Sequence, residues 1–191
     1  MTVQTSETPY LAGQLLIAMP GMPDPRFAKA VIYVCAHNED GAMGLVINQA
    51  MEEITFGDLL QQLDIVPIGL TDTISVQMGG PVEQGRGFVL HTSDYAHETT
   101  MQVDETVALT STMDVLKAIA EGHGPNKCLL ALGYAGWGPG QLDEEMLHNG
   151  WLNVLADPDL LFDGELDGKW KRALDKLGID LSLLSEDAGH A

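Results

Sequence analysis

Short, continuous apolar runs constrain the fold of this chain more than any other feature of its sequence. The three clearest are Gln14–Met19, Ala30–Ala36 and Cys128–Leu132. Runs of this length are typical of buried strands, because helices in globular proteins need about ten residues or more. Turn residues such as Pro20-Gly21 end them. Similar patterns predict further strands at 45–48, 74–78, 87–91, 106–109 and 152–155, and a short helix at 142–147.

Helical patterns lie between the later strands. Thr55 and Asp58 have the spacing of a capping box, with Asp in place of the usual Glu, and they predict a helix over 55–63. Apolar faces at helical spacing predict two more helices, which begin near Ser111 and near Asp167. Because strands occur first in hairpins and then between helices, the sequence predicts an α+β fold with a mixed sheet.

The size of the chain predicts one domain. A chain of 191 residues with 45% hydrophobic residues has the length and composition of a single globule with a substantial core. We expect residues 11–184 to form this domain, with flexible ends at 1–10 and 185–191. No internal repeat and no long linker divides the chain.

The cysteines and the first residues indicate a cellular compartment. Cys35 and Cys128 lie inside apolar runs, and two buried thiols do not make a disulfide framework, which favours a reducing cytosol. Residues 1–10 contain no basic residue and no apolar core of a signal peptide. The apolar run at Leu15–Met19 is far too short to span a membrane. We therefore expect a cytoplasmic protein that does not enter a membrane.

The charge of the chain argues against nucleic acid as a partner. Nine Lys and Arg stand against 28 Asp and Glu, which gives a net charge of -19. Duplex DNA is bound mainly by cations that neutralise phosphates, and a strongly acidic chain repels it at long range. Four of the nine cations lie within Lys169–Lys176, the one segment that offers a basic face. We expect no nucleic-acid binding.

Two histidines are candidates for hydrolytic chemistry. His37 follows Cys35 by two positions, so the two side chains are expected to face the same side of a strand. His91 is close in sequence to Ser93 and Asp94, the residue types of a hydrolytic triad. Asp143 and its acidic neighbours supply carboxylates, although acidic residues are also favoured in the first turn of a helix. A structural role for each histidine remains the alternative, since the chain has no Gly-x-Ser-x-Gly motif.

Neither a metal nor a cofactor is expected. The chain lacks Cys-x-x-Cys and paired histidines at metal-ligand spacing. Its glycine-rich runs, Gly79-Gly80-Pro81 and Gly133–Gly140, match neither a P-loop nor the dinucleotide fingerprint. Two explanations remain for these glycines: tight turns, or loops that approach a ligand closely.

The segment 133–151 is the most specialised part of the sequence. It holds five glycines and a proline around Tyr134, Trp137 and Trp151, and large aromatic side chains among glycines suit a recognition surface as well as a core. Arg86 is isolated among glycines, where it could clamp an anion or pair with a carboxylate. Because three glycine-containing segments end predicted strands, we expect 133–151, 79–81 and 37–48 to meet in one surface.

The order and spacing of these motifs resemble the YqgE/AlgH family of bacterial proteins over roughly residues 11–181. The resemblance rests on segments at 13–20, 24–27, 37–38, 41–48, 79–82, 86–91, 133–142 and 161–163, and on Trp170. It implies a compact α+β domain with coiled, mixed sheets flanked by helices, and it brings no assigned reaction, cofactor or catalytic residue. The name AlgH refers to a regulatory role in alginate production, but the family carries no recognisable DNA-binding motif.

These observations predict a binding or regulatory module that acts on a protein partner or a small ligand. The alternative is a hydrolase that uses His37 or His91 with a carboxylate. A nucleic-acid-binding transcriptional regulator is a third and weaker hypothesis. The candidate ligand or partner surface consists of His37, Asn48, Gly79, Gly80, Pro81, Arg86, Tyr134, Trp137 and Gln141.

Overall fold

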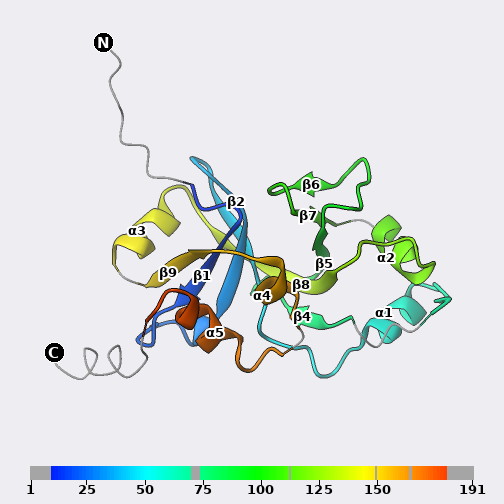
Figure 1. Ribbon diagram of the computed structural model, residues 1–191, viewed down its shortest axis with the longest axis horizontal. Coiled ribbons are helices and arrows are strands. Elements are labelled where there is room, and N and C mark those ends of the chain that lie inside the picture. Colours follow the sequence, from blue (N-terminus) through cyan, green and yellow to red (C-terminus); the bar gives the residue numbers. More distant parts are fainter. Residues whose placement is uncertain (1–9, 70–73, 112, 149, 164, 180–191) are drawn as a thin grey trace, which may run out of the picture.

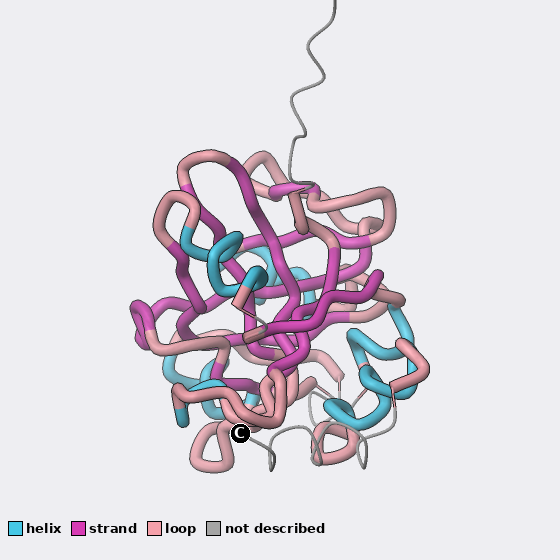
Figure 2. The backbone as a smooth tube through the Cα atoms, turned by 90° about the vertical axis from the view of Figure 1, so that its left-hand side faces the viewer, coloured by secondary structure: helices cyan, strands magenta, loops and turns pink. Residues whose placement is uncertain are grey.

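A curled sheet of nine strands runs through the described part of the chain (Figures 1 and 2). This computed structural model describes residues 10–69, 74–111, 113–148, 150–163 and 165–179. The predicted flexible ends, 1–10 and 185–191, lie outside these residues apart from Tyr10. The limits of the domain at 11 and 184 stay a prediction.

The sheet is mixed. Its strands are β1 (Gln14–Ala18), β2 (Val31–Asn38), β3 (Gly41–Val46), β4 (Val76–Met78), β5 (Val82–Thr92), β6 (Met101–Gln102), β7 (Val107–Thr110), β8 (Cys128–Trp137) and β9 (Trp151–Leu155). Their order is β6-β7-β5-β8-β3-β2-β1-β9, and β4 pairs with β8 outside this path. The β4–β8 pair is parallel, and the other paired strands are antiparallel. The predicted α+β fold is confirmed.

Helices flank the sheet. They are α1 (Phe56–Gln62), α2 (Met113–Ala120), α3 (Gln141–Leu147), α4 (Pro158–Phe162) and α5 (Lys169–Lys176), with a short 3-10 turn at Pro25–Phe27. Helices α1 and α2 lie at one end of the molecule, and α3 and α5 lie at the other, beside β9 and β1 (Figure 1). No helix of the described ranges is long and apolar enough to cross a membrane.

The predicted capping box of α1 is present. Thr55 Oγ1 accepts a hydrogen bond from the Asp58 N–H (3.1 Å), and the Thr55 N–H donates to Asp58 Oδ2 (3.0 Å). Sequence reasoning missed α4, although Asp157 caps it and Pro158 occupies its first turn. Both are recognised start signals of a helix.

The apolar runs are buried on both faces of the sheet, as their continuity predicts. Along β1, Leu15 and Ile17 pack in one cluster with Tyr33, whereas Leu16 packs in a second cluster with Trp151. A third cluster fills the space beneath α1 and α2. We call the first two the front and the back cluster. Their separation by the sheet decides which candidate residues can share a site.

The glycines of two predicted turns allow backbones to cross closely. The strand β8 continues through Gly133 to Trp137, where sequence analysis expected it to end at Leu132. Gly133 has a φ of +77°, and a Cβ there would lie 2.5 Å from the Gly80 carbonyl oxygen. A Cβ on Gly80 would lie 2.1 Å from the carbonyl carbon of Tyr134. These glycines therefore hold the β4–β5 turn against β8.

Candidate functional site

A groove on the front face of the sheet contains three of the predicted site residues. It encloses about 680 Å³ between the tip of the β2–β3 hairpin and strands β5 to β7. Its wall includes Arg86, Tyr134 and part of Trp137. The groove is also lined by apolar and polar side chains, which include Met43, Val82, Phe88, Met101 and Leu109 and the polar Asn38, Asp40, Thr99 and Ser111. We call it the Tyr134 groove.

Aromatic rings and one guanidinium form one wall of the Tyr134 groove. The rings of Tyr134 and Phe88 meet edge to face, with centroids 5.8 Å apart. The Arg86 Cζ lies 5.0 Å from the Phe88 ring centroid, within the range of a cation–π contact. Arg86 Nη1 is also 3.6 Å from Glu83 Oε2. Arg86 could clamp an anion or pair with a carboxylate, and in the structure it pairs with the Glu83 carboxylate. About half of its side chain remains exposed.

A bulge in β5 places Arg86 above the groove. Val82 pairs with Tyr134 and Gly87 pairs with Leu132, so residues 83–86 have no partners in the ladder. Glu83 adopts a φ of +45°, which is strained for a residue with a side chain. Burial raises the pKa of the Tyr134 hydroxyl, and a hydrogen bond with the Glu83 carboxylate adds to this shift. Glu83 thus joins the tyrosine to the arginine.

A second bulge, in β2, separates His37 from the Tyr134 groove. The register shifts between Val34 and Ala36, so the alternation of faces changes at Cys35. Cys35 packs in the front cluster, and Ala36 lines the groove. His37 points to the back face, toward helix α3. The expectation that Cys35 and His37 face the same side is therefore wrong, because Cys35 is the extra residue of the bulge and the alternation of faces starts again at Ala36.

Both ring nitrogens of His37 are engaged. Nδ1 accepts a hydrogen bond from the Leu11 N–H (3.0 Å), and Nε2 lies 3.5 Å from Asp143 Oδ1. Tyr10 packs edge to face on the imidazole, with centroids 5.1 Å apart. His37 does face a carboxylate, as the hydrolase hypothesis requires. However, no ring nitrogen is open to take a proton from a substrate in this arrangement.

His91 lies in a buried polar chain. Its Nδ1 is 2.8 Å from the Thr92 carbonyl oxygen, and its Nε2 is 2.8 Å from Thr110 Oγ1. Burial lowers its pKa. Ser93 Oγ donates instead to the Glu105 carbonyl (2.8 Å), while Asp94 accepts from the Asn126 N–H (2.9 Å). The three residue types of a triad are therefore not aligned as one.

The remaining predicted residues make structural contacts, either with the backbone or within the core. Asn48 bonds the Val31 N–H and the Lys29 carbonyl, both at 2.9 Å. The Trp137 ring is buried in the back cluster against Trp151. Gln141 Oε1 accepts from the Gly138 N–H (3.0 Å) at the start of α3. Gly79 accepts from the Val46 N–H (2.8 Å), next to Gly80 and Pro81.

The three segments expected to meet are neighbours in the sheet, but their side chains do not converge. Ala42 pairs with Trp137, and the turn at Gly79-Gly80 packs on β8. The side chains of His37 and Trp137 lie on the back face, whereas Tyr134 and Arg86 lie on the front. Arg86 and Tyr134 are the predicted residues that share a site through their side chains.

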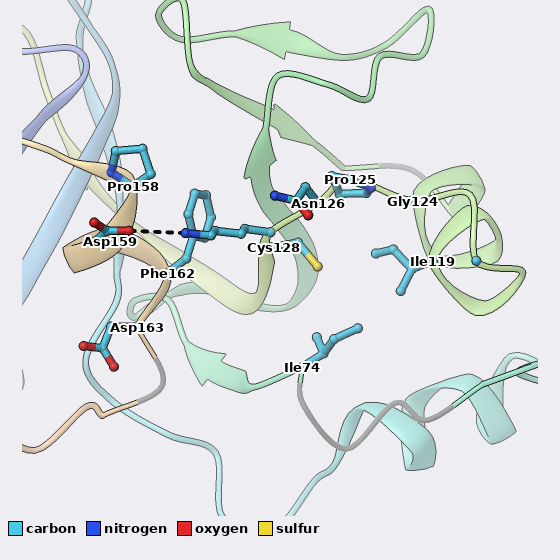
Figure 3. Close-up of a pocket in the computed structure, with 12 residues that line it drawn as sticks. Ile74, Ile119, Gly124, Pro125, Asn126, Cys128, Pro158, Asp159, Phe162 and Asp163 are labelled. Atoms are coloured by element: carbon cyan, nitrogen blue, oxygen red, sulfur yellow. Dashed lines mark hydrogen bonds and ion pairs between the residues drawn. The ribbon is translucent and has the colours of Figure 1, made fainter.

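Sequence reasoning missed a second hollow, of about 640 Å³, between α2, α4 and the start of β8 (Figure 3). Lys127 Nζ pairs with Asp159 Oδ1 at its rim (3.3 Å). The Cys128 thiol points toward Ile74 and Ile119 inside it (Figure 3). Burial raises the pKa of this thiol to about 11, which keeps it protonated and weakly nucleophilic. The loop before β8 carries no sequence signal that predicts a hollow.

The curled mixed sheet and the Tyr134 groove define a small α+β protein with a candidate binding site on the front face. Comparison with known proteins gives the family. A profile described as AlgH-like matches residues 15–182, and the chain belongs to this family. The resemblance inferred from the motifs is confirmed.

Relatives and solved structures agree with this assignment. The chain is 58% identical to a UPF0301 protein of Afipia carboxidovorans, over 98% of this chain and 93% of the relative. It is also 58% identical to one of Rhodospirillum rubrum, over 95% of each. The solution structure of the AlgH protein from Pseudomonas aeruginosa is similar over 100% of both chains, with 46% identity and a TM-score of 0.78. Protein DIP2367 of Corynebacterium diphtheriae shares the fold at 21% identity and a TM-score of 0.73, over 93% and 92% of the two chains.

Proposed function

We propose that this protein is a cytoplasmic binding module with a regulatory role, and that its ligand or protein partner docks in the Tyr134 groove. The observation that carries this proposal is the wall formed by Arg86, Phe88 and Tyr134. Aromatic and arginine side chains dominate the energetics of binding surfaces because they bury a large area and retain a polar group.

The composition of the groove supports an amphipathic ligand. Met43 and Met101 also line it, and methionine adapts to ligands of different shape. Asn38, Asp40 and Arg86 place polar groups at the rim. An apolar floor with a few polar groups at its edge is the usual composition of a ligand site.

The hydrolase hypothesis has less support from the same residues. His37 and His91 each have both ring nitrogens within hydrogen-bond or ion-pair distance of the protein. A general base must reach the proton that it removes. A substrate would first have to displace one of these partners, such as the Leu11 N–H or the Thr110 hydroxyl, from a ring nitrogen.

A fragment screen by amide NMR tests the proposed function. We expect ligands that shift the amide signals of Met43, Arg86 and Tyr134. Arg86→Gln and Met101→Gln should each weaken these ligands by about fivefold or more, because loss of a hot-spot contact costs about 1 kcal/mol or more.

Matched controls exist for both variants. Arg26 is an exposed arginine paired with Asp24, so Arg26→Gln removes the same charge outside the groove. Met113 is an exposed methionine of α2, so Met113→Gln makes the same change at a distance. The proposal fails if the ligands shift other amides, or if the control variants weaken binding as much as the groove variants.

A further inference from the structure

Some of the Lys and Arg side chains of this acidic chain form ion pairs with carboxylates, and others do not. All nine Lys and Arg residues lie in the described ranges. Those that pair with a carboxylate are Arg26, Arg86, Lys127, Arg172 and Lys176. Lys169 is buried and donates to carbonyl oxygens. Within the described residues, Lys29, Lys117 and Lys171 form no ion pair.

Two of these three lysines line one hollow. It encloses about 400 Å³ between the start of α5 and the ends of β2 and β3 that face it. Lys29 and Lys171 contribute the cations, Asn48 and Gln49 contribute amides, and Trp170 contributes an aromatic wall. Asp167 contributes the one carboxylate. The hollow shares no lining residue with the Tyr134 groove.

The backbone of Lys29 is held in a strained conformation. Its φ of 54° lies in the left-handed region, which costs a residue with a side chain about 1 kcal/mol or more. Asn48 fixes it, because Nδ2 donates to the Lys29 carbonyl (2.9 Å) while Oδ1 accepts from the Val31 N–H (2.9 Å). Strain of this kind persists where the surrounding structure holds a side chain in place.

That conformation directs the Lys29 ammonium toward Trp170. The Nζ atom lies 5.7 Å from the indole centroid. Trp170 is itself fixed, because its Nε1–H donates to the Ala18 carbonyl (2.8 Å) and the ring is almost fully buried. The hollow thus combines a positioned cation, a rigid ring and a second unpaired cation on Lys171.

We propose that this hollow binds a small organic phosphate, with the phosphate between Lys29 and Lys171 and the carbon portion against Trp170. A doubly charged phosphate matches two unpaired ammonium groups, and lysine is a common phosphate ligand. The volume exceeds that of the phosphate alone, so a ring or sugar is needed to fill it. The net charge of -19 opposes any anion, but at physiological ionic strength charges more than about 8 Å away are largely screened.

Titration with phenyl phosphate, followed by amide NMR in about 150 mM salt, tests the proposal. We expect saturable shifts around Lys29, Gln49 and Lys171 and weaker binding of inorganic phosphate. Lys29→Gln and Lys171→Gln should each weaken phenyl phosphate by about threefold or more, as expected for the loss of one partly exposed ion pair. Asp167→Asn should strengthen it, because the opposing charge is removed.

The third unpaired lysine supplies the matched control. Lys117→Gln changes the net charge of the chain by the same amount, but Lys117 lies on α2, outside the hollow. The proposal is overturned if Lys117→Gln weakens binding as much as Lys29→Gln. It is also overturned if phenol binds as tightly as phenyl phosphate, or if no shift saturates up to about 10 mM, since weaker binding than this is not specific.

Discussion

Lys169 illustrates how single residues in this chain combine structural and electrostatic roles. Its Nζ donates to the carbonyl oxygens of Leu161 (3.2 Å) and Asp163 (3.0 Å) at the end of α4. Cations near the carboxyl end of a helix stabilise it. Burial lowers the pKa of Lys169 to about 8, although the nearby Asp163 carboxylate opposes the shift. The residue that sequence analysis placed in a basic face is thus an internal cap.

The two thiols should differ in accessibility but share low reactivity. Burial raises the pKa of Cys35 to about 12 and that of Cys128 to about 11, so both are protonated at neutral pH. Cys128 borders the hollow of Figure 3, whereas Cys35 is 3% exposed. We expect a maleimide to modify the native protein slowly and at Cys128 first, as followed by intact mass.

Cys128→Ser provides the control for this measurement. Its native form should stay unmodified until urea unfolds the protein and exposes Cys35. Rapid modification of Cys35 in the folded Cys128→Ser variant would contradict the burial of β2.

At the scale of elements, the cap of α1 and the positions of most strands were predictable from local patterns. Thr55 and Asp58 act within four residues of each other, so the sequence contains the whole interaction. The bulge in β2 after Val34 was not predictable, because an extra residue in a strand is defined by its partner strand. Because of the extra residue in β2, the His37 side chain lies outside the Tyr134 groove. The bulge in β5 likewise places the Arg86 side chain inside this groove.

The crossing of the β4–β5 turn over β8 should be sensitive to any side chain at Gly133. Gly133→Ala would force a Cβ to within 2.5 Å of the Gly80 carbonyl oxygen at a φ of +77°. We expect the free energy of unfolding to fall by about 2 kcal/mol or more, measured by urea denaturation.

Gly138→Ala is the matched control in the same segment. A Cβ there would meet only Gln141 Oε1, at an ordinary 3.8 Å. Its effect should stay within about 1 kcal/mol, the intrinsic difference between glycine and alanine. Equal losses in both variants would show that the close crossing does not limit stability.

At the scale of the whole molecule, the fold class could be predicted from the composition and from the pattern of apolar residues. The candidate site could not be predicted in this way. Apolar runs and capping signals are local, so they predicted an α+β domain with a mixed sheet. The site depends on which side chains share a face, and this is set by pairings between distant strands. The antiparallel pairing of β5 with β8 is one such pairing, and together with the β5 bulge it brings Arg86 and Tyr134 to the same groove.

The distribution of charge should prevent binding to duplex DNA. The one basic helix, α5, has Arg172 paired with Asp163, Lys176 paired with Asp157, and Lys169 buried. Among the residues that the structure describes, Lys171 is the one cation of this helix that is exposed and forms no ion pair. We expect no sub-micromolar binding of random duplex DNA in about 150 mM salt, measured by fluorescence anisotropy. Tight binding that weakens steeply with added salt would refute this expectation.

The place of β1 between β2 and β9 has a consequence for synthesis on the ribosome. Trp170 donates to the Ala18 carbonyl across 152 positions of the chain, and β9 pairs with β1 along its full length. At about 5–20 residues per second, the nascent β1 waits roughly 8–30 s for these partners. β2 can pair with one edge of β1 soon after it is made, but the edge that pairs with β9 stays free during that time. An unpaired strand edge on a partly folded chain is exposed to aggregation, so we expect this edge to be the vulnerable part of the nascent protein.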